Sequence, residues 1–93
     1  MHGLSPIERK KLKARAHGLD PIVHLGEKGL TGAVLAEIDR ALTAHELIKV
    51  RAGSLDREAR EAALAEICAR LDARPVQHIG KVLIVYRKKP AES

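Results

Sequence analysis

Hydrophobic residues recur at helical spacing in three segments of the chain, and each segment follows a residue that can cap a helix. Residues 5–16 open with Ser-Pro-Ile-Glu, the pattern of a capping box with proline in the first turn. A second amphipathic segment begins near Thr31 or Gly32, and a third covers residues 56–71. Gly18 follows the first segment and is expected to end that helix. The pattern therefore predicts three helices.

Shorter apolar segments lie between and after these helices. Within residues 46–52 apolar and basic side chains alternate, as in a strand with one buried face. The last segment is apolar at every position, so we expect it to be an interior strand, joined to the preceding strand by a tight turn at Gly80 and Lys81. The predicted strands are residues 21–25, 46–52, 76–79 and 82–86.

The order of these elements, α-β-α-β-α-β-β, constrains the topology. Helical connections favour parallel pairing of the strands they join, while the final two strands form an antiparallel hairpin. We predict a single domain over residues 1–93, of the α/β class in an α+β two-layer arrangement, with a four-stranded mixed sheet. The last strand is expected between the second and the third, and the basic tail from about residue 88 onward is expected to fray.

The chain is basic, with 17 Lys and Arg against 12 Asp and Glu and a net charge of +5. Such an excess favours a polyanionic partner. Tyr86 is the only Phe, Trp or Tyr, so the sheet offers no aromatic platform for bases, and contacts with nucleic acid should be to phosphate and sugar. A single cysteine excludes an internal disulfide, and the lack of an apolar leader or spanning segment favours a cytoplasmic protein that does not enter a membrane.

The basic residues are clustered along the sequence. Five lie in the first predicted helix, where Glu8 is the only acid, and three more follow the last strand. A charged helix face is usually just solvated, but this density favours contact with a polyanion. The side chains expected to contact phosphate are Arg9, Lys10, Lys11, Lys13, Arg15, Lys49, Arg51, Arg87 and Lys88.

The segment Gly26-Glu27-Lys28-Gly29 lies between a predicted strand and the start of the second helix. The first amides of a helix lack internal partners, and together with the helix dipole they favour an anion such as phosphate. Glycines allow close approach to the main chain, and Lys28 adds a positive charge. An ordinary turn is the alternative. We expect Lys28→Ala and Gly29→Asp to impair RNA binding while leaving thermal stability nearly intact.

The sequence gives no support for catalysis, and no cofactor or metal is expected. The five histidines lack metal-ligand spacing, and no pair of carboxylates suggests an acid and base set. Cys68 lies on the apolar stripe of the third helix, where we expect a packed thiol. His24 is next to the glycine segment, where it could touch RNA, but a lone strand histidine is more often structural.

The residues around the glycine segment resemble the CRM domain. The resemblance runs through residues 23–31, 34–38, 45–50 and 76–87, in order and over nearly the whole chain. Among proteins with this domain, the chain resembles the stand-alone bacterial YhbY family. The resemblance implies a fold similar to the C-terminal domain of translation initiation factor three, and a GxxG loop, similar to that of KH domains, that binds RNA. It also implies association with precursors of the large ribosomal subunit.

These observations predict an RNA-binding protein, not an enzyme. It is expected to act in ribosome biogenesis as a monomer on pre-ribosomal particles, and to hold rRNA phosphates with its glycine segment and basic helix. The alternative is a protein-interaction adaptor whose basic face docks on an acidic partner. The resemblance implies that the RNA-binding GxxG loop consists of Gly26, Glu27, Lys28 and Gly29.

Overall fold

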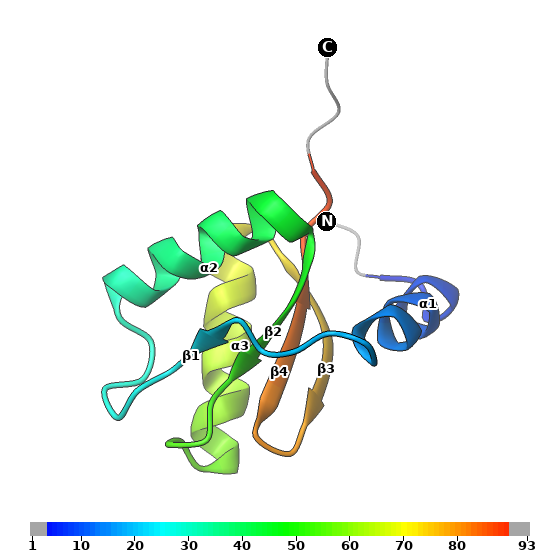
Figure 1. Ribbon diagram of the computed structural model, residues 1–93. Helices are drawn as coiled ribbons and strands as arrows, with labels where there is room; N and C mark the ends of the chain where they lie inside the picture. Colours follow the sequence, from blue (N-terminus) through cyan, green and yellow to red (C-terminus); the bar gives the residue numbers. More distant parts are fainter. Residues whose placement is uncertain (1–3, 90–93) are drawn as a thin grey trace.

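The computed structural model describes residues 4–89, which form three helices and four strands around one sheet (Figure 1). The predicted order of elements is confirmed. The elements are α1 (Pro6–Ala16), β1 (Val23–His24), α2 (Gly32–His45), β2 (Leu47–Arg51), α3 (Arg57–Leu71), β3 (Arg74–Ile79) and β4 (Val82–Tyr86).

The sheet has the strand order β1-β2-β4-β3, so the fully apolar strand β4 is interior, as predicted. β1 pairs with β2 in parallel, while β4 is antiparallel to both of its neighbours. β1 is shorter than predicted, and β3 begins earlier, at Arg74. The register of β3 shifts between Pro75 and Gln77, and an edge strand tolerates both the bulge and the proline, which cannot donate to a neighbouring strand.

Helices cover both faces of the sheet. One core contains Ile38 of α2 and Ile67 of α3 packed against the strand residues Ile48, Val50 and Leu83. A second core lies on the other face, where Leu12 and Ala16 of α1 pack with Leu47, Val76 and Ile84. The predicted mixed sheet with three helices is confirmed, but α1 adds a third layer to the expected two. The reason is that β2 and β4 carry apolar residues on both faces.

The helix caps follow the sequence closely. Ser5 and Glu8 form the predicted capping box of α1, and α2 and α3 are capped by Thr31 and Asp56. The end of α1 differs from expectation, because Gly18 does not adopt a left-handed conformation. The amide of Leu19 donates to the Ala16 carbonyl oxygen at 3.0 Å, so the helix ends in a tighter turn without a glycine cap.

The predicted frayed tail lies mostly outside the described residues. At its start the Lys89 amide donates to a Glu46 carboxylate oxygen at 2.8 Å, which holds this part of the tail against the end of α2. Among residues 4–89, no helix is long and apolar enough to cross a membrane.

Candidate nucleic-acid interface

Residues 26–29, the glycine loop, form a tight turn directly after β1. The Gly29 amide donates to the Gly26 carbonyl oxygen at 2.9 Å, which closes the turn. Glu27 and Lys28 project from its tip and are exposed, whereas Gly29 is buried and has a φ of 70°. The glycine loop is thus a turn with an open tip and a buried end.

The turn that follows β2, residues 52–55, packs against the glycine loop, and we call it the supporting turn. Ser54 Oγ lies 2.8 Å from the Gly26 carbonyl oxygen and 3.1 Å from that of Leu25, so its hydroxyl proton is shared between them. A Cβ added to Gly29 would lie 3.6 Å from Leu55 Cδ2, which shows how close the loop lies to the Leu55 side chain. Because β1 and β2 are parallel neighbours, the segments after them meet at one end of the sheet.

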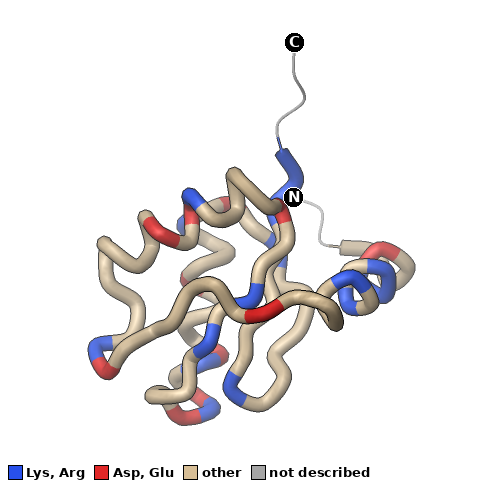
Figure 2. The backbone as a smooth tube through the Cα atoms, in the orientation of Figure 1, with Lys and Arg blue, Asp and Glu red and all other residues tan. Residues whose placement is uncertain are grey.

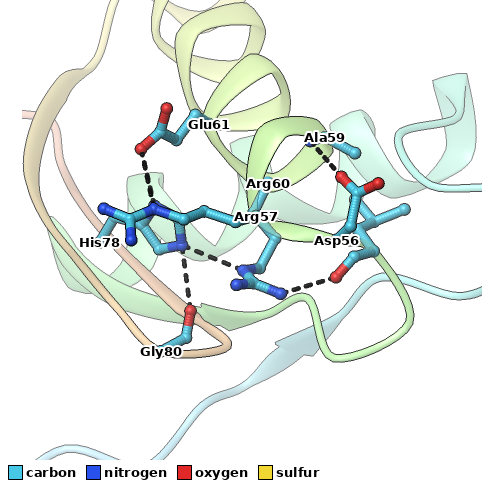
Figure 3. Close-up of polar contacts among 8 residues, drawn as sticks. Asp56, Arg57, Ala59, Arg60, Glu61, His78 and Gly80 are labelled. Carbon is cyan, nitrogen blue, oxygen red and sulfur yellow. Dashed lines mark hydrogen bonds and ion pairs between the residues drawn. The ribbon is translucent and has the colours of Figure 1, made fainter.

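Arg60 and His78 hold this supporting turn in place (Figure 3). The Arg60 guanidinium donates to the Leu55 carbonyl oxygen at 2.7 Å and, through Nε, to His78 Nε2 at 3.1 Å. The same His78 nitrogen lies 3.0 Å from the Gly80 carbonyl oxygen, and Glu61 lies 3.9 Å from the other ring nitrogen. The supporting turn is therefore tied to α3 and to the β3–β4 hairpin.

Two residues separate the glycine loop from the start of helix α2 at Gly32, and the first turn of this helix is open to an anion. Thr31 Oγ1 accepts from the Val34 amide at 3.2 Å, and the Thr31 carbonyl oxygen accepts from Leu35. The amides of Gly32 and Ala33 donate to no group within the described part of the chain. The first turn holds no acidic residue, whereas those of α1 and α3 each hold one. A negative charge is favoured at such a helix start.

Basic positions occur at the same end of the sheet as the glycine loop, together with acidic ones (Figure 2). Lys28 is at the tip of the loop, Arg51 ends β2, and Lys81 is in the hairpin turn that leads into β4. A Cβ added to Gly53 would lie 3.5 Å from Lys81 Cδ and 3.8 Å from Arg51 Nε, so these two side chains flank the supporting turn. None of the three forms an ion pair or side-chain hydrogen bond within residues 4–89. We refer to Lys28, Arg51 and Lys81 as the loop-end cations.

Most of the other predicted cations, those of α1 and the tail, form a second group that is remote from the glycine loop. β4 runs from the loop end of the sheet to the opposite end, so Lys88 follows it at the far end. Helix α1 lies over β2 and β3, whereas the glycine loop follows the edge strand β1. Lys49 lies between the groups, on the sheet face that α1 covers in part. The helix-and-tail cations are Arg9, Lys10, Lys11, Lys13, Arg15 and Lys88.

Arg87 was predicted to contact phosphate, but its guanidinium already has four partners. It donates to Asp39 Oδ1 at 2.7 Å, to the Asp39 and Leu71 carbonyl oxygens at 3.0 Å each, and to Thr43 Oγ1 at 2.9 Å. The side chain is 21% exposed. Arg87 thus connects β4 to α2 and to the end of α3, and we leave it out of the candidate interface.

No group among residues 4–89 suggests a metal site, because no three His, Cys, Asp or Glu side chains lie close enough to share an ion. Cys68 of α3 is partly buried against the core between the sheet and helices α2 and α3, as predicted. Burial raises the pKa of the Cys68 thiol to about 11, with the nearby Arg74 opposing the shift. The thiol is therefore protonated near neutral pH and is a poor nucleophile.

Three residues of the site were missed by sequence reasoning. Ser54 and Leu55 carry no motif, and Lys81 was interpreted only as part of a turn. Their positions follow from the topology, because the segments after two parallel neighbouring strands and the hairpin before β4 must lie at one end of the sheet. The predicted sheet order already implied this, because it places the ends of these strands together.

Comparison with known proteins places the chain in a family. Residues 4–87 match the CRS1/YhbY (CRM) domain. A Pseudomonas aeruginosa protein named "Probable RNA-binding protein" is 46% identical over 94% of this chain and 84% of its own length. A Haemophilus influenzae "RNA-binding protein" is also 46% identical, over 94% of this chain and 88% of its own. The solution structure of a hypothetical Staphylococcus aureus protein superposes with a TM-score of 0.84 at 26% identity, over 97% of this chain and 94% of the other. The chain therefore belongs to the CRS1/YhbY (CRM) domain family.

Proposed function

We propose that this protein binds RNA by holding phosphates at the loop end of its sheet. The observation that carries the proposal is the meeting of the open glycine loop, the free first amides of α2 and the loop-end cations. Phosphate oxygens would accept from main-chain amides near the loop tip, where Gly26 leaves room for close approach because nothing lies within 4 Å of an added Cβ. Glu27 contributes main chain only, because its carboxylate would repel phosphate.

The names of two relatives support RNA as the ligand. Phosphate contacts position a protein on nucleic acid without reading its sequence, so this arrangement suits recognition of RNA shape. Within residues 4–89 the hydroxyl in contact with the loop, that of Ser54, has only carbonyl oxygens as partners and no base beside it. We infer a binding protein and not a catalyst.

The salt dependence of binding reports how many cations take part. Three phosphates neutralised by the loop-end cations give a slope of log K against log salt of about −2 to −3, because each neutralised phosphate releases counterions. Participation of the helix-and-tail cations would make the slope considerably steeper. A slope near zero would contradict phosphate binding altogether.

The finer role that we propose is assembly of the large ribosomal subunit, with precursor rRNA in a pre-ribosomal particle as the target. The CRM resemblance suggests it, and a compact basic domain suits a shape-reading assembly factor. Crosslinking the protein to RNA in cells and mapping the crosslinked nucleotides tests this role. Crosslinks outside precursor rRNA would contradict it while leaving RNA binding intact.

The decisive experiment replaces Gly26 with Asp and, as the matched control, with Asn. Both side chains have the same shape, and both meet open space at this position. Asp places a negative charge where phosphate is expected, so Gly26→Asp should bind a structured RNA at least tenfold more weakly than Gly26→Asn, measured by filter binding at low salt. Equal affinities would show that no phosphate lies at the loop tip.

An acidic protein could also be attracted to the loop-end cations, and a second measurement separates this alternative. Cell lysate is treated with ribonuclease before the protein and its complexes are sedimented. Release of the protein supports the RNA proposal. Continued co-sedimentation after complete RNA digestion would instead identify an adaptor that docks on protein.

A further inference from the structure

Helix α1 leaves part of its sheet face open at the hairpin end of the sheet. His24, Arg51, Val82 and Ile79 are paired in register and form one row across all four strands. Their side chains share the α1 face, because the alternating residues Val50 and Leu83 face the core beneath α2 and α3. In Figure 1 the chain between α1 and β1 crosses this face, and the row lies at the hairpin end. Ile79 is 48% exposed there.

The open face contains a hollow of about 130 Å³ with an apolar floor and a basic edge. The buried residues Ala16 and Ile84 form the floor, Val82 and Ile79 extend it toward the hairpin, and His17 and Lys49 complete the lining. No acidic residue lines it. Arg51 and Lys81 adjoin Val82, one across the β2–β4 pair and the other along the chain, so free cations flank an apolar surface.

We propose that this hollow receives the base of an unpaired nucleotide whose neighbouring phosphates contact Lys49, Arg51 and Lys81. The inference rests on the proposed RNA binding and specifies its target. A nucleobase is a flat, largely apolar group attached to negative charges, which matches an aliphatic floor with a basic edge. Among the described residues, no Phe, Tyr or Trp lines the hollow, and Tyr86 of the same sheet face lies at the other end of β4. The base would therefore lie against Ile79 and Val82 through van der Waals contact rather than aromatic stacking.

Base pairing decides whether a nucleotide can enter. In an RNA duplex the bases are stacked inside, and mainly phosphates and sugars reach a flat protein surface. An unpaired nucleotide can turn its base toward the hollow. The structure therefore favours RNA in which an unpaired segment adjoins a helix, with the glycine loop on the phosphates and the hollow on the unpaired base.

The test uses two RNAs and two exposed isoleucines. One RNA is a hairpin with a single-stranded flank, and the other is the same hairpin with the flank paired to a complementary strand. Ile79→Ser removes the apolar edge of the hollow, and Ile7→Ser is the matched control because Ile7 is 70% exposed on α1, away from the lining residues. Thermal melts check that both variants fold. We expect Ile79→Ser to fold because Ile79 is half-exposed on an edge strand.

We expect Ile79→Ser to weaken binding of the flanked hairpin about five- to tenfold, as lost burial of one apolar side chain implies. Binding of the fully paired RNA and both affinities of Ile7→Ser should stay unchanged. An equal loss for both RNAs, or none, would overturn the assignment. Wild-type protein that binds both RNAs equally would also overturn it while leaving RNA binding intact, whereas failure to bind either RNA would refute the proposed function itself.

A base analogue gives an independent readout on the unmodified protein. 2-Aminopurine placed at each position of the single-stranded flank in turn changes its fluorescence when its base leaves the stack and contacts the protein. One position should respond strongly to wild-type protein and weakly to Ile79→Ser. A flank that gives no change at any position would show that no base enters the hollow.

Discussion

The two glycines of the loop should respond oppositely to the same substitution. Gly29 has a φ of 70°, a left-handed conformation that costs an alanine roughly 1–2 kcal/mol. Gly26 lies outside that region, and a Cβ there meets nothing within 4 Å. Each Gly→Ala change also restricts the unfolded chain, which stabilises the folded state by about 0.4–1 kcal/mol.

The unfolded-state contribution is nearly the same at both positions and cancels in the difference between the variants. Packing adds little, because a Cβ on Gly29 lies 3.6 Å from Leu55 Cδ2, an ordinary van der Waals separation. The backbone cost therefore decides the sign. The Gly29→Ala protein should be about 1–2 kcal/mol less stable than Gly26→Ala, a difference in melting temperature of roughly 4–16 °C for a domain of this size.

Calorimetry or circular dichroism measures the two melting temperatures, and filter binding at a temperature where both proteins are folded measures RNA affinity. We expect Gly26→Ala to keep its stability and lose affinity, because its methyl group lies at the exposed start of the loop. Equal melting temperatures would refute the conformational argument. The structure also corrects our expectation for Gly29→Asp, since a side chain at this buried, left-handed position lowers stability and cannot test binding alone.

Three further predictions concern single groups. Arg87→Met should lower the free energy of unfolding in urea by about 2 kcal/mol, because hydrogen bonds from a charged group are lost, while Lys88→Met, at an exposed position, should not. The thiol of Cys68 should react with iodoacetamide with a midpoint near pH 11 in the folded protein and near 9.0 in the unfolded chain, and a folded midpoint near 9.0 would contradict its burial. The hydrogen bond from the Ser5 amide, and next the one with the Ser5 side chain, lower the pKa of Glu8 below 4.5. The ionised Glu8 therefore stabilises the folded protein above pH 4.5, and this stabilisation is lost as pH falls through the lowered pKa. Melting temperatures measured over a pH series should fall less in acid for Ser5→Ala than for the wild type.

Local signals predicted most of the fold because they act over a few residues. Ser5 and Glu8 satisfy free amides of one helix, and the uninterrupted apolar residues of β4 require cover on both faces, so each feature specified its own element. The elements that were misjudged depend on distant partners. β1 is limited to Val23 and His24 because only these residues pair with β2, and β3 starts at Arg74 because Tyr86 is there to pair with it.

The grouping of charges depends on the fold and not on neighbours in sequence. Lys28, Arg51 and Lys81 are each more than 20 residues apart, yet one sheet end brings them together, while the dense cluster of α1 lies over β2 and β3. Arg87 lies beside Lys88 in sequence, but only Arg87 meets Asp39 and Leu71. Charge density along a chain therefore indicates a polyanion partner, whereas the free charges beside an open main chain indicate where it binds. The salt slope and the Gly26 variants test the loop end, and variants of the α1 cations test the helix. If only the loop end changes RNA affinity, the density of charge along the sequence will have predicted the correct ligand but the wrong surface.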